Sequence, residues 1–403
     1  MADRPDFQAT HLPEDLQGIR LNEAKIIWRE IFRPCRNLYQ IEARQAVILK
    51  LSKVGDFANL RRSKNLAYQA LEGYAELFCP LRISGQEREV SLLEAFRQEL
   101  ARSSVERNSQ IVSRAQSAFQ SIQAGRAALN ECSRLLRTSD SPYLCLIAGD
   151  LEGVETALGR FTPDYFSETW ISITDVKKSL RDYHETLQTF GVFVEVAKLV
   201  KKGYWNAVSA DPSRPAYYRE GYNIVYPESL GFRNDSPADT PVTVYSGSEK
   251  SGKTTTGLLQ HFLIQLSWQA FGITAAKQGN LHIHGAIALI GKSATINHES
   301  GRSVHETERK NMAEMFNLPG ESPLYFLNEP ASHLSAAEQA STIESVVQTA
   351  LTVPGGRVII DTHNQDFIEN AVRDPVMAVY HFETQVAPDG KVIYCYAMLP
   401  GRG

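Results

Sequence analysis

The pattern of hydrophobic and polar positions changes near the middle of the chain. Before about residue 204, apolar residues recur every three or four positions over long segments, which is typical of amphipathic helices. After about residue 234, short apolar runs alternate with helical segments, which is typical of buried strands joined by helices. The 403 residues therefore predict an α-helical N-terminal domain followed by an α/β domain.

The most regular helix is predicted between about Ser104 and Arg137. Its small and apolar residues alternate in steps of four and three, which is a heptad-like seam. The small residues allow a close partner helix, and an intramolecular bundle is a simpler explanation than a dimerising coiled coil. The seam consists of Ile111, Ala115, Ala118, Ile122, Gly125, Leu129, Cys132 and Leu136.

The remaining elements follow from the same periodicities. Helices are predicted from Lys25 to about Leu51 with a break at Arg33-Pro34, from Leu60 to Phe78, and from about Ile173 to Gly203. The segment from Tyr204 to Asn234 is rich in Pro, Gly, Tyr and Asn and is predicted to be a connector. Strands are predicted at Pro241–Tyr245, Ala286–Ile290, Leu324–Leu327 and Arg357–Ile360, with a C-terminal hairpin of Met377–Gln385 and Lys391–Met398 around Pro388-Asp389-Gly390.

A glycine-rich loop follows the first predicted strand and precedes a long apolar helix, Leu258 to Phe271. It reads GSEKSGKTT and fits the phosphate-binding pattern G-x-x-x-x-G-K-[ST]. In such a loop, backbone N–H groups surround the phosphates, Lys253 reaches the β- and γ-phosphates, and the Thr254 hydroxyl binds Mg²⁺. The predicted nucleotide-binding residues are Gly247, Ser248, Glu249, Lys250, Ser251, Gly252, Lys253, Thr254 and Thr255.

Two later strands end in residues suited to phosphate chemistry. Leu324–Leu327 is followed by Asn328 and Glu329, where nucleotide-binding domains usually carry one acid for the Mg²⁺ shell and a second that polarises water. Asn328 can bind a metal-bound water but carries no charge, and Glu329 can act as general base. His363 follows another strand, where a γ-phosphate sensor and a structural histidine are equally plausible.

A small-residue loop around Ser303 opens a further predicted helix. Its N–H groups and the serine hydroxyl can contact an anion. Together with this loop, the ordered segments GSEKSGKT, LYFLNEPASHLS and IIDTH resemble the ATPase domain of the MutS family, a branch of the ABC-type ATPases. The resemblance is strong over residues 222–403 and thin over residues 25–221, which would form a helical core and lever domain after an N-terminal tail at 1–24.

The resemblance implies a dimer, of this chain or with a related subunit, formed through ATPase domains that share two composite sites for ATP and Mg²⁺. One subunit would supply Lys253, Thr254, Glu329 and His363, and the other would supply Ser303 in trans. Phe232 lies in a segment similar to one whose aromatic ring packs near the adenine. ATP would then lock or open a clamp around double-stranded or branched DNA.

Several residues depart from the family pattern. Asn328 replaces the metal-binding aspartate, and Glu249 stands where asparagine is usual. Val304 and His305 replace the Thr-Phe pair that usually follows the serine. The segment before Lys25 is expected to be too short for a mismatch-reading domain. An added carboxylate beside phosphates is unfavourable unless it is neutralised, so we expect ATP binding with weakened or lost hydrolysis.

Composition limits the partners and the cellular compartment that can be expected. A net charge of −4 argues against a protein whose whole surface binds nucleic acid. Five scattered cysteines without a C-x-x-C pair favour a reducing compartment. Without a long apolar run or a signal-peptide pattern, a cytoplasmic protein is expected, nucleoid-associated or nuclear in a eukaryote, with no membrane partner.

Three interpretations follow. The first is a MutS-related, DNA-associated ATPase or clamp that acts on branched or distorted DNA in repair or recombination without mismatch reading. The second is a degenerate ATPase that serves as an ATP-gated dimerisation or regulatory module, which Asn328 and Glu249 favour. The third is a soluble ABC-type ATPase outside the MutS branch, which the absence of an LSGGQ-like loop disfavours.

Overall fold

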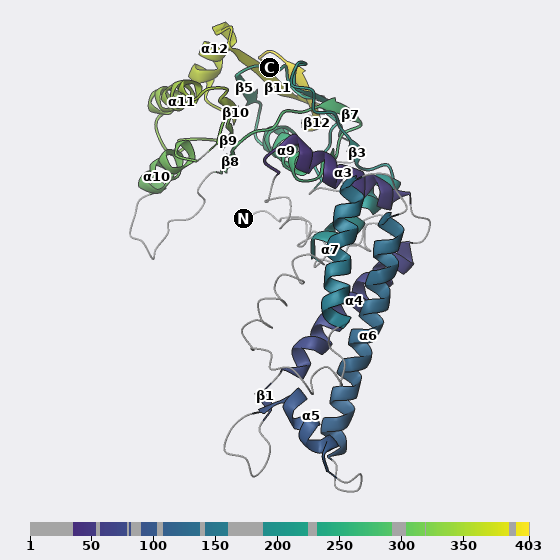
Figure 1. Ribbon diagram of the computed structural model, residues 1–403. Helices are drawn as coiled ribbons and strands as arrows, with labels where there is room; N and C mark the ends of the chain where they lie inside the picture. Colours follow the sequence, from purple (N-terminus) through teal and green to yellow (C-terminus); the bar gives the residue numbers. More distant parts are fainter. Residues whose placement is uncertain are drawn as a thin grey trace. The chain divides into compact units, whose positions relative to one another are not determined.

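The computed structural model describes residues 35–53, 57–78, 80–81, 90–102, 108–137, 142–159, 188–224, 232–291, 304–318, 320–386 and 392–402. Within this part the chain forms two compact units (Figure 1). One unit contains residues 35–45 and 203–402, and the other contains residues 46–202. The first residues of helix α3 (Leu38–Ser52) belong to one unit and the last to the other.

The helical unit is built around α6 (Ser109–Arg137), which packs against α4 (Phe57–Leu77), α5 (Leu92–Leu100) and α7 (Pro142–Gly159). A short antiparallel pair, β1 (Pro80–Leu81) with β2 (Val90–Ser91), precedes α5. Residues 188–201 are also helical. The rest of the helix expected from Ile173, the residues before Cys35 and Ser303 lie outside the described residues.

The predicted seam on α6 is confirmed, because all of its residues are buried. Its small residues bring two helices of the same chain close together. A Cβ atom at Gly125 would lie 2.3 Å from the Ala70 Cβ and 2.8 Å from the Leu66 carbonyl oxygen of α4. A Cβ at Gly73 would lie 2.8 Å from the Ala118 carbonyl oxygen of α6. The partner of the seam is therefore an intramolecular helix, as expected.

The other unit contains a mixed, mostly parallel sheet of six strands. Its order is β12-β11-β5-β10-β9-β8, in which β12 is antiparallel to β11 and the other neighbours are parallel. This supports the predicted α/β architecture. The strands are β5 (Val242–Ser246), β8 (Ile287–Ile290), β9 (Leu324–Asn328), β10 (Arg357–Asp361), β11 (Met377–Val386) and β12 (Val392–Pro400).

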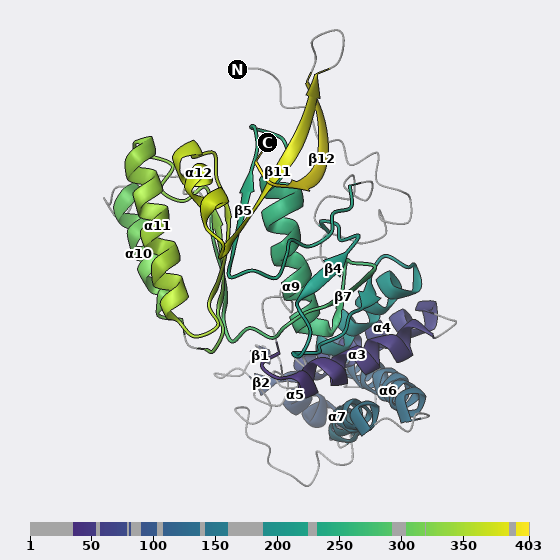
Figure 2. The ribbon, with the colours of Figure 1, turned by 90° about the horizontal axis from the view of Figure 1, so that it is seen from above.

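Helices cover both faces of this sheet. Figure 2 shows α10 (Val304–Phe316), α11 (Ala336–Thr352) and α12 (Gln365–Arg373) on one face and α9 (Leu259–Phe271) on the other. Alternate strand residues supply the two cores, as the period of a strand requires. Val244 and Leu327 join the core beneath α10–α12, whereas Phe326 packs against Phe262 of α9 with ring centroids 5.2 Å apart.

The predicted connector between Tyr204 and Asn234 was wrong in part, because it contains two short strands. β3 (Asn206–Ala207) pairs with β6 (Ile273–Thr274), and β4 (Tyr217–Arg219) pairs with β7 (Gln278–Asn280). The buried Tyr218 anchors β4 in a core with Trp268 of α9. Tertiary burial thus overrides the local turn composition, and the segment from residue 203 joins the unit that holds the sheet.

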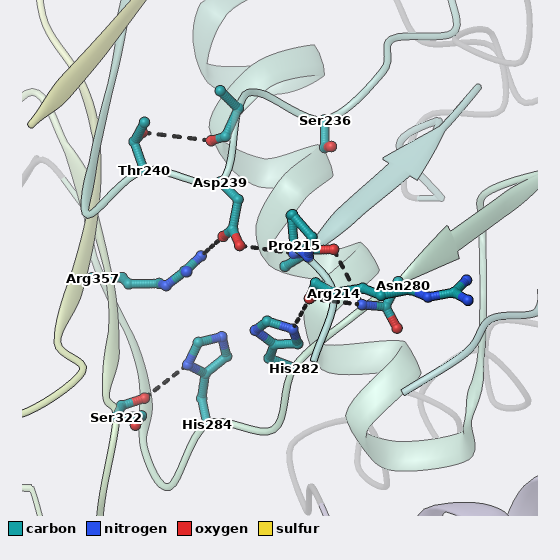
Figure 3. A network of polar contacts seen from close by, with 12 residues as sticks. Arg214, Pro215, Ser236, Asp239, Thr240, Asn280, His282, His284, Ser322 and Arg357 are labelled. Carbon is teal, nitrogen blue, oxygen red and sulfur yellow. Dashed lines mark hydrogen bonds and ion pairs between the residues drawn. The ribbon is translucent and has the colours of Figure 1, made fainter. Parts of the chain in front are cut away.

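A polar network closes the edge of the sheet where β9 and β10 begin (Figure 3). Arg357, the first residue of β10, forms an ion pair with Asp239, which precedes β5. The Asn280 side chain donates to the carbonyl oxygens of Arg214 and Pro215 at 3.2 and 3.1 Å. These contacts tie the exposed turn at Arg214 and Pro215 to β7.

Two histidines, His282 and His284, lie in this network. The His282 ring contacts the Arg214 carbonyl oxygen at 2.8 Å, and the His284 ring contacts the Ser322 carbonyl oxygen at 2.7 Å. Each imidazole therefore satisfies a backbone group.

None of the helices in the described part of the chain is long and apolar enough to cross a membrane.

Two glycine-to-alanine substitutions in the helical unit should change the free energy of unfolding in opposite directions. Gly125→Ala should lower the free energy of unfolding by about 1–3 kcal/mol, because the new methyl group overlaps Ala70. Gly153→Ala on α7, where nothing lies within 4 Å of the new Cβ, should raise it by about 0.5–1 kcal/mol. Urea denaturation of both variants measures the difference. A stabilising Gly125→Ala would contradict the helix packing.

Candidate functional site

The topology places the candidate site at the carboxyl ends of three neighbouring strands. From β5 the chain crosses to β8 at the edge of the sheet and returns through β9 to β10, beside β5. It then passes to β11 on the other side of β5. Ligands of doubly wound sheets bind where the winding reverses, outside the carboxyl ends of the strands. Here that point lies between β5 and β10.

The predicted phosphate loop links β5 to a helix whose first turns, η4 (Lys253–Leu258), are π-helical. Short π-helical segments are frequent at functional sites. Two glycines permit the loop: φ is 145° at Gly247 and 104° at Gly252, values that favour glycine. A Cβ at Gly252 would also lie 2.5 Å from the Tyr396 ring and 2.7 Å from the Thr256 hydroxyl.

The other loop residues differ in exposure. Ser248, Glu249 and Lys250 are exposed, while Ser251 is buried and its hydroxyl has no hydrogen-bond partner within the described residues. An unpartnered buried hydroxyl is costly and fits a loop that acquires a polar ligand. The Thr255 carbonyl oxygen accepts a hydrogen bond from the Asn223 side chain, which fixes the helix start from outside the loop.

Three of the predicted catalytic residues meet at this edge. Lys253 Nζ lies 3.0 Å from Glu329 Oε1, and His363 Nε2 lies 3.3 Å from the same oxygen. The Lys253 side chain is 6% exposed and the Glu329 side chain 18%, so their ion pair is largely shielded from water. Such a pair gains more Coulomb energy than a surface pair, and separating it without a replacement partner is costly.

Glu329 has an unusual backbone that its neighbour stabilises. Its φ is 46°, in the left-handed region that non-glycine residues rarely adopt. The Glu329 N–H group lies 3.0 Å from the Asp361 carbonyl oxygen and 2.8 Å from Asp361 Oδ1. Strain of this kind is often found at functional sites, where the surrounding structure holds it. The turn aims the Glu329 carboxylate toward Lys253.

Asp361 is a site residue that the sequence interpretation missed. It is fully buried at the end of β10, and its carboxylate accepts a hydrogen bond from the Thr254 hydroxyl. The Asn328 side chain, with its amide nitrogen turned toward Asp361, lies 3.0 and 3.2 Å from the two carboxylate oxygens. The parallel register could have revealed this proximity, because Asp361 pairs with Asn328 on β9 and with Tyr245 on β5.

Burial shifts the protonation of two groups at this edge. It raises the pKa of the Asp361 carboxyl to about 6, although the hydrogen bonds from Thr254 and Glu329 act in the opposite direction. It lowers the pKa of the His363 imidazole, and the positive charge of Lys253 acts in the same direction. His363 is therefore neutral at pH 7, with a ring nitrogen available to donate a hydrogen bond.

An aromatic pair lies beside the start of η4. The rings of Phe232 and Tyr396 are 4.5 Å apart between centroids, and Tyr396 also adopts a left-handed φ of 54°. Asn234 holds β12 in place by donating to the Tyr396 carbonyl oxygen at 3.1 Å and accepting from the Met398 N–H group at 2.9 Å. Tyr396 was not expected from the sequence, because nothing in the hairpin pattern placed it near the loop.

Within the described residues, cavities lie at both ends of the sheet. One of about 500 Å³ adjoins the predicted phosphate loop and is lined by Gly247, Ser248 and His363 together with residues of β11 and α12. Ligand sites commonly have about this volume. Another, beside Asp239 and Arg357, measures about 40 Å³, which is room for water but not for a nucleotide.

These residues fit a magnesium nucleotide. A buried carboxylate beside a threonine hydroxyl offers the oxygen ligands that Mg²⁺ prefers. The glycine loop, the lysine and the unpartnered Ser251 hydroxyl offer positive potential and donors to phosphates.

Comparison of the sequence with protein families and with curated proteins finds no match.

The raised pKa of Asp361 gives a test of the site in the absence of ligands. The native state holds this proton more tightly than the unfolded chain, whose carboxyl has the ordinary value of 3.8. Its contribution to stability is therefore complete below about pH 4 and is lost as the pH rises through about 6.

At pH 7, Asp361→Asn should raise the free energy of unfolding of the unliganded protein by about 1–3 kcal/mol, given about 1.4 kcal/mol per unit of pKa. The gain should vanish near pH 4. Asp366→Asn, at an exposed position on α12, is the control. Chemical denaturation at both pH values checks this, and a variant less stable than the wild type at pH 7 would contradict the buried charge.

Proposed function

We propose that this chain binds ATP with Mg²⁺ at the carboxyl ends of β5, β9 and β10, and hydrolyses it. The observation that supports this most strongly is the convergence of segments that are far apart in the sequence. Glu329, after β9, contacts both Lys253 of the G-x-x-x-x-G-K-T loop and His363, which follows β10. Such a set is suited to positioning a phosphate and activating a water.

Binding would exchange the partner of Lys253. In the structure its ammonium group pairs with Glu329 at 3.0 Å. A triphosphate carries more negative charge, so it would attract the ammonium group and release the Glu329 carboxylate. The N–H groups at the start of η4 would complete the phosphate contacts, because the first turn of a helix leaves its donors unpaired within the helix.

Hydrolysis would then use the released carboxylate. Water would attack the γ-phosphorus while Glu329 accepts its proton, the bond to the β–γ bridging oxygen would break, and ADP would leave. Neutral His363 would donate a hydrogen bond to the γ-phosphate. Thr254 would hold Mg²⁺ together with Asn328 through a bound water, and the ion supplies charge neutralisation for the phosphates. The Phe232–Tyr396 pair supports a base site beside the loop, since aromatic rings stack on nucleobases.

The MutS-like motifs extend the proposal to DNA and to assembly. By that resemblance the protein is a DNA-associated ATPase or clamp that acts on branched or distorted duplexes, as a dimer in which Ser303 of one subunit completes the site of the other. Two features favour a second function, in which ATP is bound but hydrolysed slowly and governs dimerisation. These features are the neutral Asn328 side chain and the exposed Glu249 in the phosphate loop.

Removal of the Lys253 ammonium group should weaken ATP binding. Lys253→Ala should raise the Kd for MgATP about 10–100-fold, which corresponds to the loss of one charge-assisted hydrogen bond. Lys277→Ala is the matched control, because that exposed lysine pairs with Glu220 away from the loop. Isothermal titration calorimetry measures both. Unchanged affinity in Lys253→Ala would sink the proposed nucleotide site.

Removal of the general base should separate hydrolysis from binding. Glu329→Gln should lower steady-state ATP turnover about 100-fold or more and leave ATP binding intact, because the isosteric amide cannot accept the proton. Turnover should be measured alone and with duplex and branched DNA, which we expect to stimulate the wild type. Equal turnover in the variant would exclude Glu329 as the base, whereas binding without turnover in the wild type would favour the ATP-gated module.

A further inference from the structure

The sequence motif suggests an acidic metal ligand at the end of β9, but the buried carboxylate of the site lies at the end of β10. β9 ends in Asn328, whose neutral amide cannot balance the charge of a divalent cation. β10 ends in Asp361, which is paired with Asn328 in the parallel register. Because β10 lies between β9 and β5, the acidic group is one strand nearer to the phosphate loop than Asn328.

Both residues that the motifs suggest as metal ligands contact this carboxylate. The Thr254 hydroxyl donates to Asp361 Oδ2, and the Asn328 amide nitrogen lies 3.0 Å from Oδ1. The backbone N–H group of Glu329 donates to the same Oδ1 at 2.8 Å. Asp361 is thus the common acceptor that draws the loop, β9 and β10 together.

We propose that Asp361 supplies the negative charge of the Mg²⁺ site and so replaces the aspartate that is missing at position 328. The inference rests on the proposed function, since the cation is the one that accompanies ATP. Asp361 is fully buried, and in the described part of the chain its hydrogen-bond donors are neutral. A buried carboxylate in such surroundings is costly, and a divalent cation beside the Thr254 hydroxyl would offset that cost.

This assignment gives Asn328 a different role from the one its position suggests. Its amide donates to Asp361 and orients that carboxyl group, so Asn328 is a positioning residue. The presence of the carboxylate on Asp361 also explains how an uncharged residue can be accommodated at the end of β9. A second carboxylate at position 328, within about 3 Å of Asp361, would introduce repulsion between like charges.

The test compares nucleotide affinity with and without the cation. The affinity of a fluorescent, non-hydrolysable ATP analogue is measured in Mg²⁺ and in EDTA. For the wild type, Mg²⁺ should strengthen binding. Asp361→Asn should lose this enhancement, with a weakening of about 10–100-fold in Mg²⁺ and no weakening in EDTA. Asp366→Asn, on the surface of α12, should behave as the wild type.

A double variant tests directly whether the carboxylate and the amide can change places between β9 and β10. Asn328→Asp combined with Asp361→Asn moves the charge back to β9 while keeping one carboxylate and one amide in the pair, and it should restore the Mg²⁺ enhancement. Thermal melting of each unliganded variant shows whether it is folded. Lys253→Ala, in contrast, should weaken binding in both Mg²⁺ and EDTA.

The outcomes separate the two proposals. Full Mg²⁺ enhancement in a folded Asp361→Asn would overturn the assignment, and so would an equal loss of affinity in Mg²⁺ and EDTA, which indicates a purely structural role. A wild type that binds the analogue in neither condition would contradict the proposed function and this inference with it. Selective loss in the single variant and recovery in the double variant would support both.

Discussion

The parallel pairing of β10 between β5 and β9 is the constraint on which the candidate site depends. Its register sets Asp361 opposite both Tyr245 and Asn328. The three strands therefore end at the same level, and the segments that follow them meet. A shift of one residue would turn every side chain of β10 to the opposite face of the sheet. Val358, Ile359 and Ile360 are buried on both faces, so such a shift would force both cores to repack around side chains of different shape.

The polar groups at the carboxyl ends of these strands also depend on one another. Glu329 adopts its left-handed backbone because two hydrogen bonds to Asp361 compensate for the strain. That conformation sets the Glu329 carboxylate against Lys253, so the buried ammonium group has a counter-charge. Under the proposed function, a nucleotide and a cation would redistribute the charges of the Lys253–Glu329 pair and of Asp361.

The sequence predicted the elements that have a strong period or a strong motif. The small-residue seam around Gly125 and the four central strands follow from periodicity, and the loop from its glycines and lysine. The short strands β3 and β4 were missed, because the Pro- and Tyr-rich segment is ordered by distant partners such as Asn280. Asp361 and Tyr396 were missed for a related reason. Their relevance comes from strand register and from β12 packing, which no local pattern encodes.

Hydrogen–deuterium exchange with and without MgATP tests the central claim most directly, because it reports where the nucleotide binds. Slower exchange is predicted in peptides that cover the loop and η4 at 247–258, the turn at 328–331 and the end of β10 at 361–364. Their N–H groups lie at the three strand ends that form the proposed site. Protection confined to peptides around Asp239 and Arg357, or no protection by MgATP anywhere, would contradict the account.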